Sequence, residues 1–204
     1  MGRKPEPELR ERILRVATDA FRRRGFDATS VDDLCQAAGV SKGAFFHHFE
    51  SKQAVAEACL ALWNQNTAKI AEMAAGLPAD DPVERLLLLL ERFTEMLSAP
   101  GAGPASCLAG TIAQEVAETN PRLREAAQNC FASAEVFFAS QIAAAADARG
   151  LALNASSLAR LWMSALQGAL ILAKASGDLR VLPEALEHVR EYIRLQLEAR
   201  ARAP

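Results

Sequence analysis

The sequence predicts an all-α protein, and three features of its composition indicate this fold class. Alanine and leucine dominate the 204 residues, β-branched residues are sparse, and the alternation of apolar and polar residues that is typical of a strand is missing. Half of the residues are hydrophobic, so the chain can bury a sizeable core. The length suits a small domain followed by a larger helical one.

The first expected helix begins near Pro7, a residue that suits a first helical turn, and ends before Gly25. Basic residues in its last turn, Arg22–Arg24, complement the helix dipole. Its apolar residues recur at helical spacing and form one stripe, which consists of Ile13, Val16, Ala17, Ala20 and Phe21. We therefore expect an amphipathic helix here.

Two short helices joined by a tight turn are expected over residues 31–49. Thr29 and Ser30 are N-cap candidates for the first of them, and Gly39 can adopt the left-handed backbone conformation that ends it. Ser41 can then cap the second helix. Such a pair is a helix-turn-helix, whose second helix lies in the major groove of DNA.

Six further helices are expected behind this motif. Proline, glycine and asparagine residues at first-turn, breaking and capping positions separate them. The expected helices cover residues 51–75, residues 82 to about 97, residues 107–118, residues 121–149, residues 155–175 and the residues from 183 onward. The sequence therefore predicts nine helices.

The charge distribution argues against nucleic-acid binding through bulk positive charge, because the net charge is −2. Residues 1–52 hold 10 Lys and Arg against 8 Asp and Glu, whereas residues 53–204 hold 13 against 17. The modest basic excess therefore lies at the helix-turn-helix end of the chain.

Cysteine spacing and hydropathy indicate a cytoplasmic protein with reduced thiols. The four cysteines lie far apart, without the paired spacing of a zinc site, so we expect no metal and no cofactor. A signal peptide is not recognisable, and the apolar run Leu86–Leu90 is far too short to span a membrane. We therefore expect no membrane association.

Three segments resemble the DNA-binding domain of the TetR family of bacterial transcriptional regulators. They are Gly25–Val31, Ala37–Gly43 and His48–Lys52, and with the helix before them they span about a quarter of the chain. The resemblance implies a nine-helix fold, with a helix-turn-helix domain over residues 1–50 and a ligand-sensing and dimerisation domain over residues 51–204. It also implies a homodimer that represses transcription and leaves a palindromic, double-stranded DNA operator when a small-molecule inducer binds.

The resemblance places the DNA-reading helix at residues 42–49. Small residues at its start, Gly43 and Ala44, would let the backbone approach the bases. Phe46 departs from the family, which usually has a tyrosine here, so a phosphate contact is lost or passes to His47. The residues expected to contact DNA are Thr29, Ser41, Lys42, Gly43, Ala44, Phe46, His47, His48 and Lys52.

The last two helices are expected to form a twofold interface. The helix over residues 155–175 is apolar over much of its circumference, which requires more than one buried contact. In the family these two helices pair with those of a second copy, and a twofold protein matches a palindromic operator. The alternative is a monomer with two core helices.

A ligand pocket is expected among the helices between residues 51 and 175. Aromatic and methionine side chains at helical spacing can line a pocket, but they are also what any helical core contains. The candidate ligand-binding residues are Trp63, Phe93, Met96, Cys107, Ile112, Phe137, Phe138, Trp162, Met163 and Gln167.

A second resemblance concerns the effector. Residues 106–108, 115–116 and 121–123 resemble a branch of the family that includes NemR-type sensors of reactive electrophiles and oxidants. In that branch the cysteine at the position of Cys107 is the sensor, and a lysine occupies the position of Lys174. Cys107 opens an expected helix, where the dipole favours a thiolate. The alternative is a plain core cysteine and a non-reactive hydrophobic inducer.

A catalytic arrangement is not apparent in the sequence. Two of the three histidines belong to the DNA motif, and the third, His188, lies in the last expected helix. Neither a Gly-rich phosphate loop nor a Ser/His/Asp arrangement is recognisable. We therefore expect a regulator without enzymatic activity; a helical-bundle enzyme or small-molecule carrier is the alternative of another class.

Overall fold

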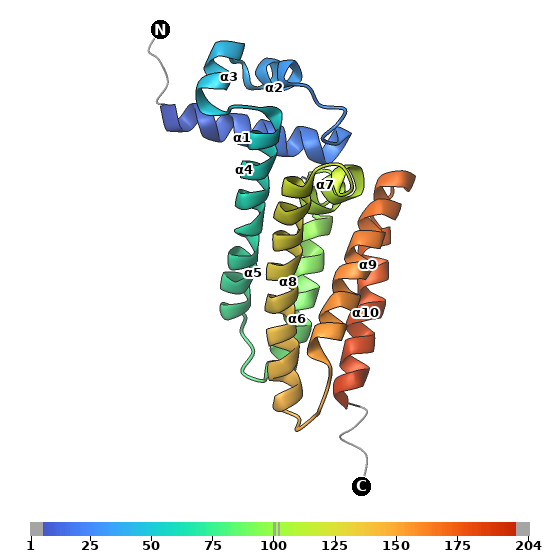
Figure 1. Cartoon of the computed structure of the whole chain (residues 1–204). Helices are drawn as coiled ribbons and strands as arrows, with labels where there is room; N and C mark the ends of the chain where they lie inside the picture. Colours follow the sequence, from blue (N-terminus) through green and yellow to red (C-terminus); the bar gives the residue numbers. More distant parts are fainter. Residues whose placement is uncertain (1–5, 100, 102, 199–204) are drawn as a thin grey trace. The chain divides into compact units, whose positions relative to one another are not determined.

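The structure is a computed structural model that describes residues 6–99, 101 and 103–198, and within these ranges it contains helices and no strand (Figure 1). The all-α prediction is confirmed. The helices are α1 Glu6–Arg24, α2 Val31–Ala38, α3 Lys42–His48, α4 Lys52–Asn64, α5 Asn66–Ala75, α6 Pro82–Ser98, α7 Leu108–Val116, α8 Pro121–Asp147, α9 Ala155–Ser176 and α10 Val181–Glu198.

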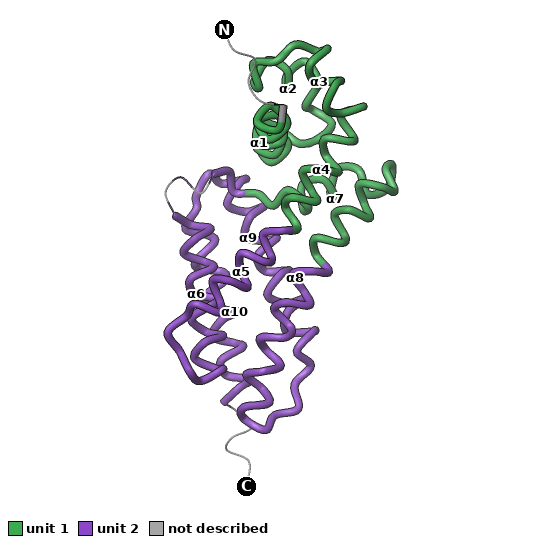
Figure 2. The backbone as a smooth tube through the Cα atoms, turned by 90° about the vertical axis from the view of Figure 1, so that its left-hand side faces the viewer, with its two compact units in different colours: residues 1–64, 106–131 green, residues 65–105, 132–204 purple. Residues whose placement is uncertain are grey.

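The helix expected over residues 51–75 occurs as two consecutive segments, α4 and α5. Only Gln65 separates them, and its φ of −65° and ψ of −15° stay in the right-handed helical region. Counted as one interrupted helix, α4 and α5 give the nine helices predicted from the sequence. A boundary between two compact units of the chain falls at the same position (Figure 2).

Unit 1 contains residues 1–64 and 106–131, and unit 2 contains residues 65–105 and 132–204. The core of unit 1 joins the helix-turn-helix to α7 and to the start of α8. Its fully buried side chains include Phe21, Leu34, Phe45, Leu108, Ile112 and Leu123. Residues 106–131 therefore belong to the same compact unit as the helix-turn-helix, while the functional boundary expected at residue 50 stays a prediction.

The helix-turn-helix forms because each of its ends is capped locally. The Ser30 Oγ accepts a hydrogen bond from the Asp33 N–H at 3.1 Å, and the Asp33 carboxylate accepts one from the Ser30 N–H at 2.8 Å. Gly39 ends α2 with a φ of 61°, and the Ser41 Oγ accepts the Ala44 N–H at 3.1 Å. The caps predicted at Ser30, Gly39 and Ser41 are confirmed.

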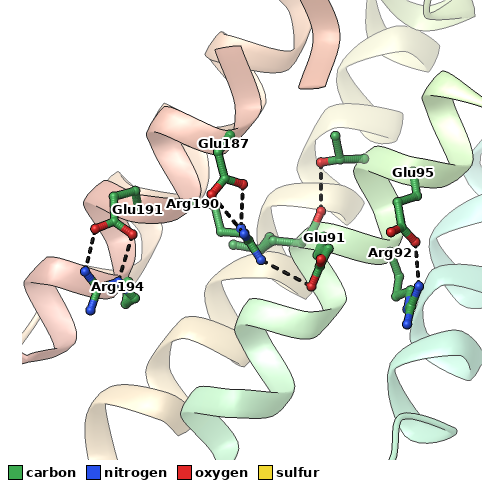
Figure 3. Close-up of polar contacts among 9 residues, drawn as sticks. Glu91, Arg92, Glu95, Glu187, Arg190, Glu191 and Arg194 are labelled. Carbon is green, nitrogen blue, oxygen red and sulfur yellow. Dashed lines mark hydrogen bonds and ion pairs between the residues drawn. The ribbon is translucent and has the colours of Figure 1, made fainter. Parts of the chain in front are cut away.

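Unit 2 is a helical bundle in which α10 packs against α9 and α6. Its core side chains come from all of its long helices and include Leu86, Leu89, Phe138, Trp162, Leu186 and Ile193. An ion pair of 3.3 Å between Arg190 and Glu91 joins α10 to α6, and Arg190 also pairs with Glu187 of its own helix (Figure 3). Such partly exposed pairs contribute little to stability, so apolar burial holds this bundle together.

A search of the described helices for a segment both long and apolar enough to cross a membrane finds none.

Candidate nucleic-acid interface

Two aromatic side chains of α3 pack into the core of unit 1, and the other residues of this helix are exposed or partly exposed. Phe45 and Phe49 are buried, with ring centroids 6.0 Å apart. Lys42, Gly43 and His47 are exposed, and Phe46 is 51% exposed. The exposed residues of α3 therefore lie opposite the face that packs into the core of unit 1.

The only lysine of α3 is already positioned by an acidic neighbour. The Lys42 Nζ lies 2.7 Å from the Asp32 Oδ1, and both side chains are well exposed. The hydrogen bond with Asp32 raises the pKa of Lys42. The ammonium is therefore charged at neutral pH, but a phosphate would have to compete with Asp32 for it.

The ammonium of Lys52 packs against the turn between α1 and α2. Its Nζ donates to the Phe26 carbonyl oxygen at 2.7 Å and lies 4.1 Å from the centroid of the Phe26 ring. Lys52 is half-buried, so it fixes the start of α4 to the turn and keeps only part of its donor capacity for a phosphate.

Thr29 is a correction to the expected DNA contacts. Its side chain is fully buried, and the hydroxyl donates to the Gly25 carbonyl oxygen at 2.7 Å. The hydroxyl proton that we expected on a phosphate is therefore used inside unit 1, where it closes the turn before α2.

The imidazole rings of His47 and His48 lie at the end of α3, 5.4 Å apart and edge to face.

Glu115 of α7 holds the turn between α1 and α2, a role that was not predicted from the sequence. Its carboxylate accepts hydrogen bonds from the backbone N–H groups of Phe26 at 2.6 Å and Asp27 at 3.1 Å. The turn that it holds begins at Gly25, whose φ is 94°. At the other end of α7, the Arg22 guanidinium donates to the Ser106 carbonyl oxygen at 3.0 and 2.9 Å. Residues 106–115 thus hold the turn that leads into the helix-turn-helix.

The expected ligand-binding residues fall in both units, and the pocket that they would share stays a prediction. Ile112 is part of the buried core of unit 1, and Trp63 lies beneath the Arg22 guanidinium at 5.0 Å in the same unit. Met96 of α6 is 47% exposed. The members in unit 2 are Phe93, Met96, Phe137, Phe138, Trp162, Met163 and Gln167.

The four cysteines differ in their surroundings. Burial raises the pKa of Cys59 and of Cys130 to about 11, and burial also raises the pKa of Cys35. Cys107 is half-buried and occupies the N-cap of α7 without a side-chain capping hydrogen bond, whereas Lys174 is exposed on α9 of unit 2. The part of the chain that the structure describes contains no cluster of three or more His, Cys, Asp or Glu side chains that could hold a metal ion.

Two family models match the chain. The model for bacterial regulatory proteins of the tetR family covers residues 13–59, and the model for the C-terminal domain of LmrA/YxaF-like transcriptional regulators covers residues 82–188. The first match contains α2 and α3 in full. The second match spans α6 to α9 and the first part of α10.

Individual proteins that resemble this chain are transcriptional regulators as well. The HTH-type transcriptional repressor NemR of Escherichia coli (strain K12) is 25% identical over 95% of this chain and 98% of its own length. The HTH-type transcriptional repressor DhaR of Mycobacterium sp. (strain GP1) is 28% identical over 61% of this chain, which spans only 59% of DhaR. A TetR-family regulator from Agrobacterium tumefaciens has the same fold, with a TM-score of 0.80 at 21% identity over 92% of this chain and 98% of that one.

These matches do not favour the thiol-sensor alternative for Cys107, and ligand-responsive repression is typical of the family. Family members bind operator DNA and small-molecule effectors, act as dimers and are typically regulators rather than enzymes. Both halves of the sequence match models of the same kind of protein, and the fold agrees. The chain therefore belongs to the TetR family of bacterial regulatory proteins and is a DNA-binding transcriptional regulator.

Proposed function

We propose that the chain is a homodimeric repressor, which a small-molecule inducer releases from a palindromic operator. The observation that carries this proposal is the capped helix-turn-helix, in which α3 is fastened by Phe45 and Phe49 and exposes its opposite side. Ligand-responsive repression is typical of the family, and the relatives NemR and DhaR are both repressors by name. The proposed place of action is the cytoplasm.

The proposed DNA-contacting surface consists of α3 and the residues that flank it. Lys42 would contact a phosphate or a base edge, Gly43 and Ala44 would allow close approach to bases, and His48 would contact a phosphate. Without a tyrosine hydroxyl, Phe46 can offer only apolar contact. The full set is Ser41, Lys42, Gly43, Ala44, Phe46, His47, His48 and Lys52, without Thr29.

The proposed twofold interface consists of α9 and α10. Large apolar side chains remain exposed on both helices, so covering them in an interface would be favourable. They are Leu161, Ile171, Leu172, Tyr192 and Leu195. A second copy would cover them, and the twofold axis would direct two α3 helices at the two halves of a palindrome.

The proposed ligand site lies in unit 2, among its aromatic side chains.

Replacing Lys42 with alanine should weaken binding to a duplex that the protein enriches from a random pool. If the dimer neutralises roughly 6–10 phosphates, the wild-type affinity should fall about 10³–10⁵-fold between about 50 and 200 mM salt. Each lost phosphate contact reduces the slope of log affinity against log salt concentration by about 1. Lys42→Ala removes one such contact from each protomer, so it should reduce this slope by about 2 per dimer. Binding is measured by fluorescence anisotropy at several salt concentrations.

Asp32→Ala is the matched control, because it frees the Lys42 ammonium from its present partner at 2.7 Å. This variant should bind DNA more tightly than the wild type. Its affinity should depend on salt concentration at least as steeply as that of the wild type. An unchanged slope in Lys42→Ala would remove Lys42 from the DNA-contacting surface.

A further inference from the structure

Phe46 lies in the second turn of α3 and keeps about half of its side chain in solvent. It is 51% exposed and is the one large apolar side chain of α2 and α3, two helices that the structure describes in full, that is exposed. Its ring packs edge to face against Phe45, with centroids 5.3 Å apart and an interplanar angle of 85°. Because Phe45 is fully buried, this contact holds the Phe46 ring in place before DNA binds.

The surface of α3 beside the Phe46 ring is open. Lys42 and Gly43 precede Phe46 by four and three residues, so all three lie on one side of the helix. Gly43 has no side chain, and a Cβ built there would meet only the Ser41 Oγ, at 3.9 Å. The Lys42 ammonium is held by Asp32 of α2 at 2.7 Å. A base edge could therefore reach the Phe46 ring on the Gly43 side.

A phenyl ring without a hydroxyl can distinguish bases in the major groove through one group. Every base pair presents hydrogen-bond donors or acceptors in this groove, and the apolar group that it presents is the C5-methyl of thymine. Covering a donor or acceptor with the Phe46 ring would take that group out of water without supplying a hydrogen bond. Covering the thymine methyl instead removes apolar surface from water on both partners. The ring therefore favours thymine at the position that it meets.

We propose that Phe46 is a specificity-determining residue that reads the C5-methyl of a thymine in each half of the operator. This inference rests on the proposed function, in which α3 lies in the major groove. It assigns a role to the position at which the family usually has a tyrosine. Apolar contact with a base replaces the phosphate contact that a tyrosine hydroxyl would make.

Replacing thymine with deoxyuridine tests the proposal, because deoxyuridine keeps the pairing with adenine and lacks only the methyl. A duplex that the wild type enriches from a random pool is substituted at one thymine position at a time, in both halves together. Fluorescence anisotropy measures binding at low salt, where phosphate contacts keep the weaker complexes measurable. At the position that Phe46 reads, the wild-type affinity should fall about 3- to 5-fold per methyl, or about 10- to 25-fold for two.

Phe46→Ala removes the ring, so it should bind the thymine and deoxyuridine duplexes equally at this position, within about twofold. The matched control is Leu62→Ala. Leu62 is the other exposed large apolar side chain in the described part of unit 1, but it lies on α4, outside the proposed DNA-contacting surface. Leu62→Ala should bind both duplexes like the wild type. Thermal denaturation checks that both variants keep the fold.

Two results would overturn the inference. In the first, no thymine position of the wild-type complex responds to loss of the methyl, which would mean that the ring covers sugar or water rather than a base. In the second, Phe46→Ala keeps the full difference between the thymine and deoxyuridine duplexes, which would mean that another side chain meets the methyl.

The same selection separates this inference from the proposed function. A palindrome without a methyl-sensitive thymine overturns the role of Phe46 and leaves the operator intact. A duplex without twofold symmetry overturns the palindrome alone, provided that Phe46→Ala removes its thymine preference. A pool from which no duplex is enriched overturns both.

Discussion

Replacing Gly25 with alanine is expected to lower the free energy of unfolding of unit 1 by about 2–4 kcal/mol. The φ of 94° is a conformation that L-residues rarely adopt, and a non-glycine residue held there costs about 1–3 kcal/mol. An added Cβ would also lie 1.8 Å from the Glu115 Oε1, so the carboxylate would have to move. Its hydrogen bonds to the N–H groups of Phe26 and Asp27 would then be lost or weakened.

Thermal and urea denaturation measure this effect, and Glu115→Ala separates its two causes. Glu115→Ala alone should cost about 1–2 kcal/mol, because the hydrogen bonds are charge-assisted but partly exposed to water. Gly25→Ala should cost less in the Glu115→Ala background than in the wild type, since only the backbone strain then remains. Equal costs in the two backgrounds would contradict the role assigned to Glu115.

Replacing Leu172 with glutamate is expected to convert the proposed dimer into a monomer. Leu172 is 60% exposed on α9, so the change should leave the fold of unit 2 intact. In a twofold interface it would bury a carboxylate without a counter-charge, which costs about 3–5 kcal/mol and weakens association by roughly 10²-fold or more. Sedimentation at micromolar concentration measures the change.

Val136→Glu provides a matched control for Leu172→Glu. Val136 is 70% exposed, but it lies on α8, outside the proposed interface. This variant should sediment like the wild type. A wild-type protein that is already monomeric, or a dimer that survives Leu172→Glu but not Val136→Glu, would contradict an interface built from α9 and α10.

Features set by neighbours in the chain could be predicted from the sequence. The caps at Ser30 and Ser41 depend on backbone groups three residues away, and the stop at Gly39 depends on its own conformation. The burial of Phe45 and Phe49 follows from their spacing on a single helical face. These local rules suffice to define the helix-turn-helix and its exposed surface.

Features set by distant parts of the chain could not be predicted. Glu115 finds its partners 88 and 89 residues away, and no local pattern in the sequence indicates that pairing. Thr29 carries the residue type of a phosphate contact, yet a turn closes over its hydroxyl.

Competition between a full palindrome and a half-site tests the central claim most directly. The palindrome is obtained by repeated selection from a random DNA pool, and the half-site duplex carries the same sequence with one half scrambled. We expect two protomers on the palindrome by analytical ultracentrifugation, and an affinity for the scrambled duplex that is at least about 10²-fold lower, since several base pairs are mismatched at about 1–3 kcal/mol each. Selection that enriches no palindrome, or equal affinities for the two duplexes, would contradict a dimer that reads DNA through two copies of α3.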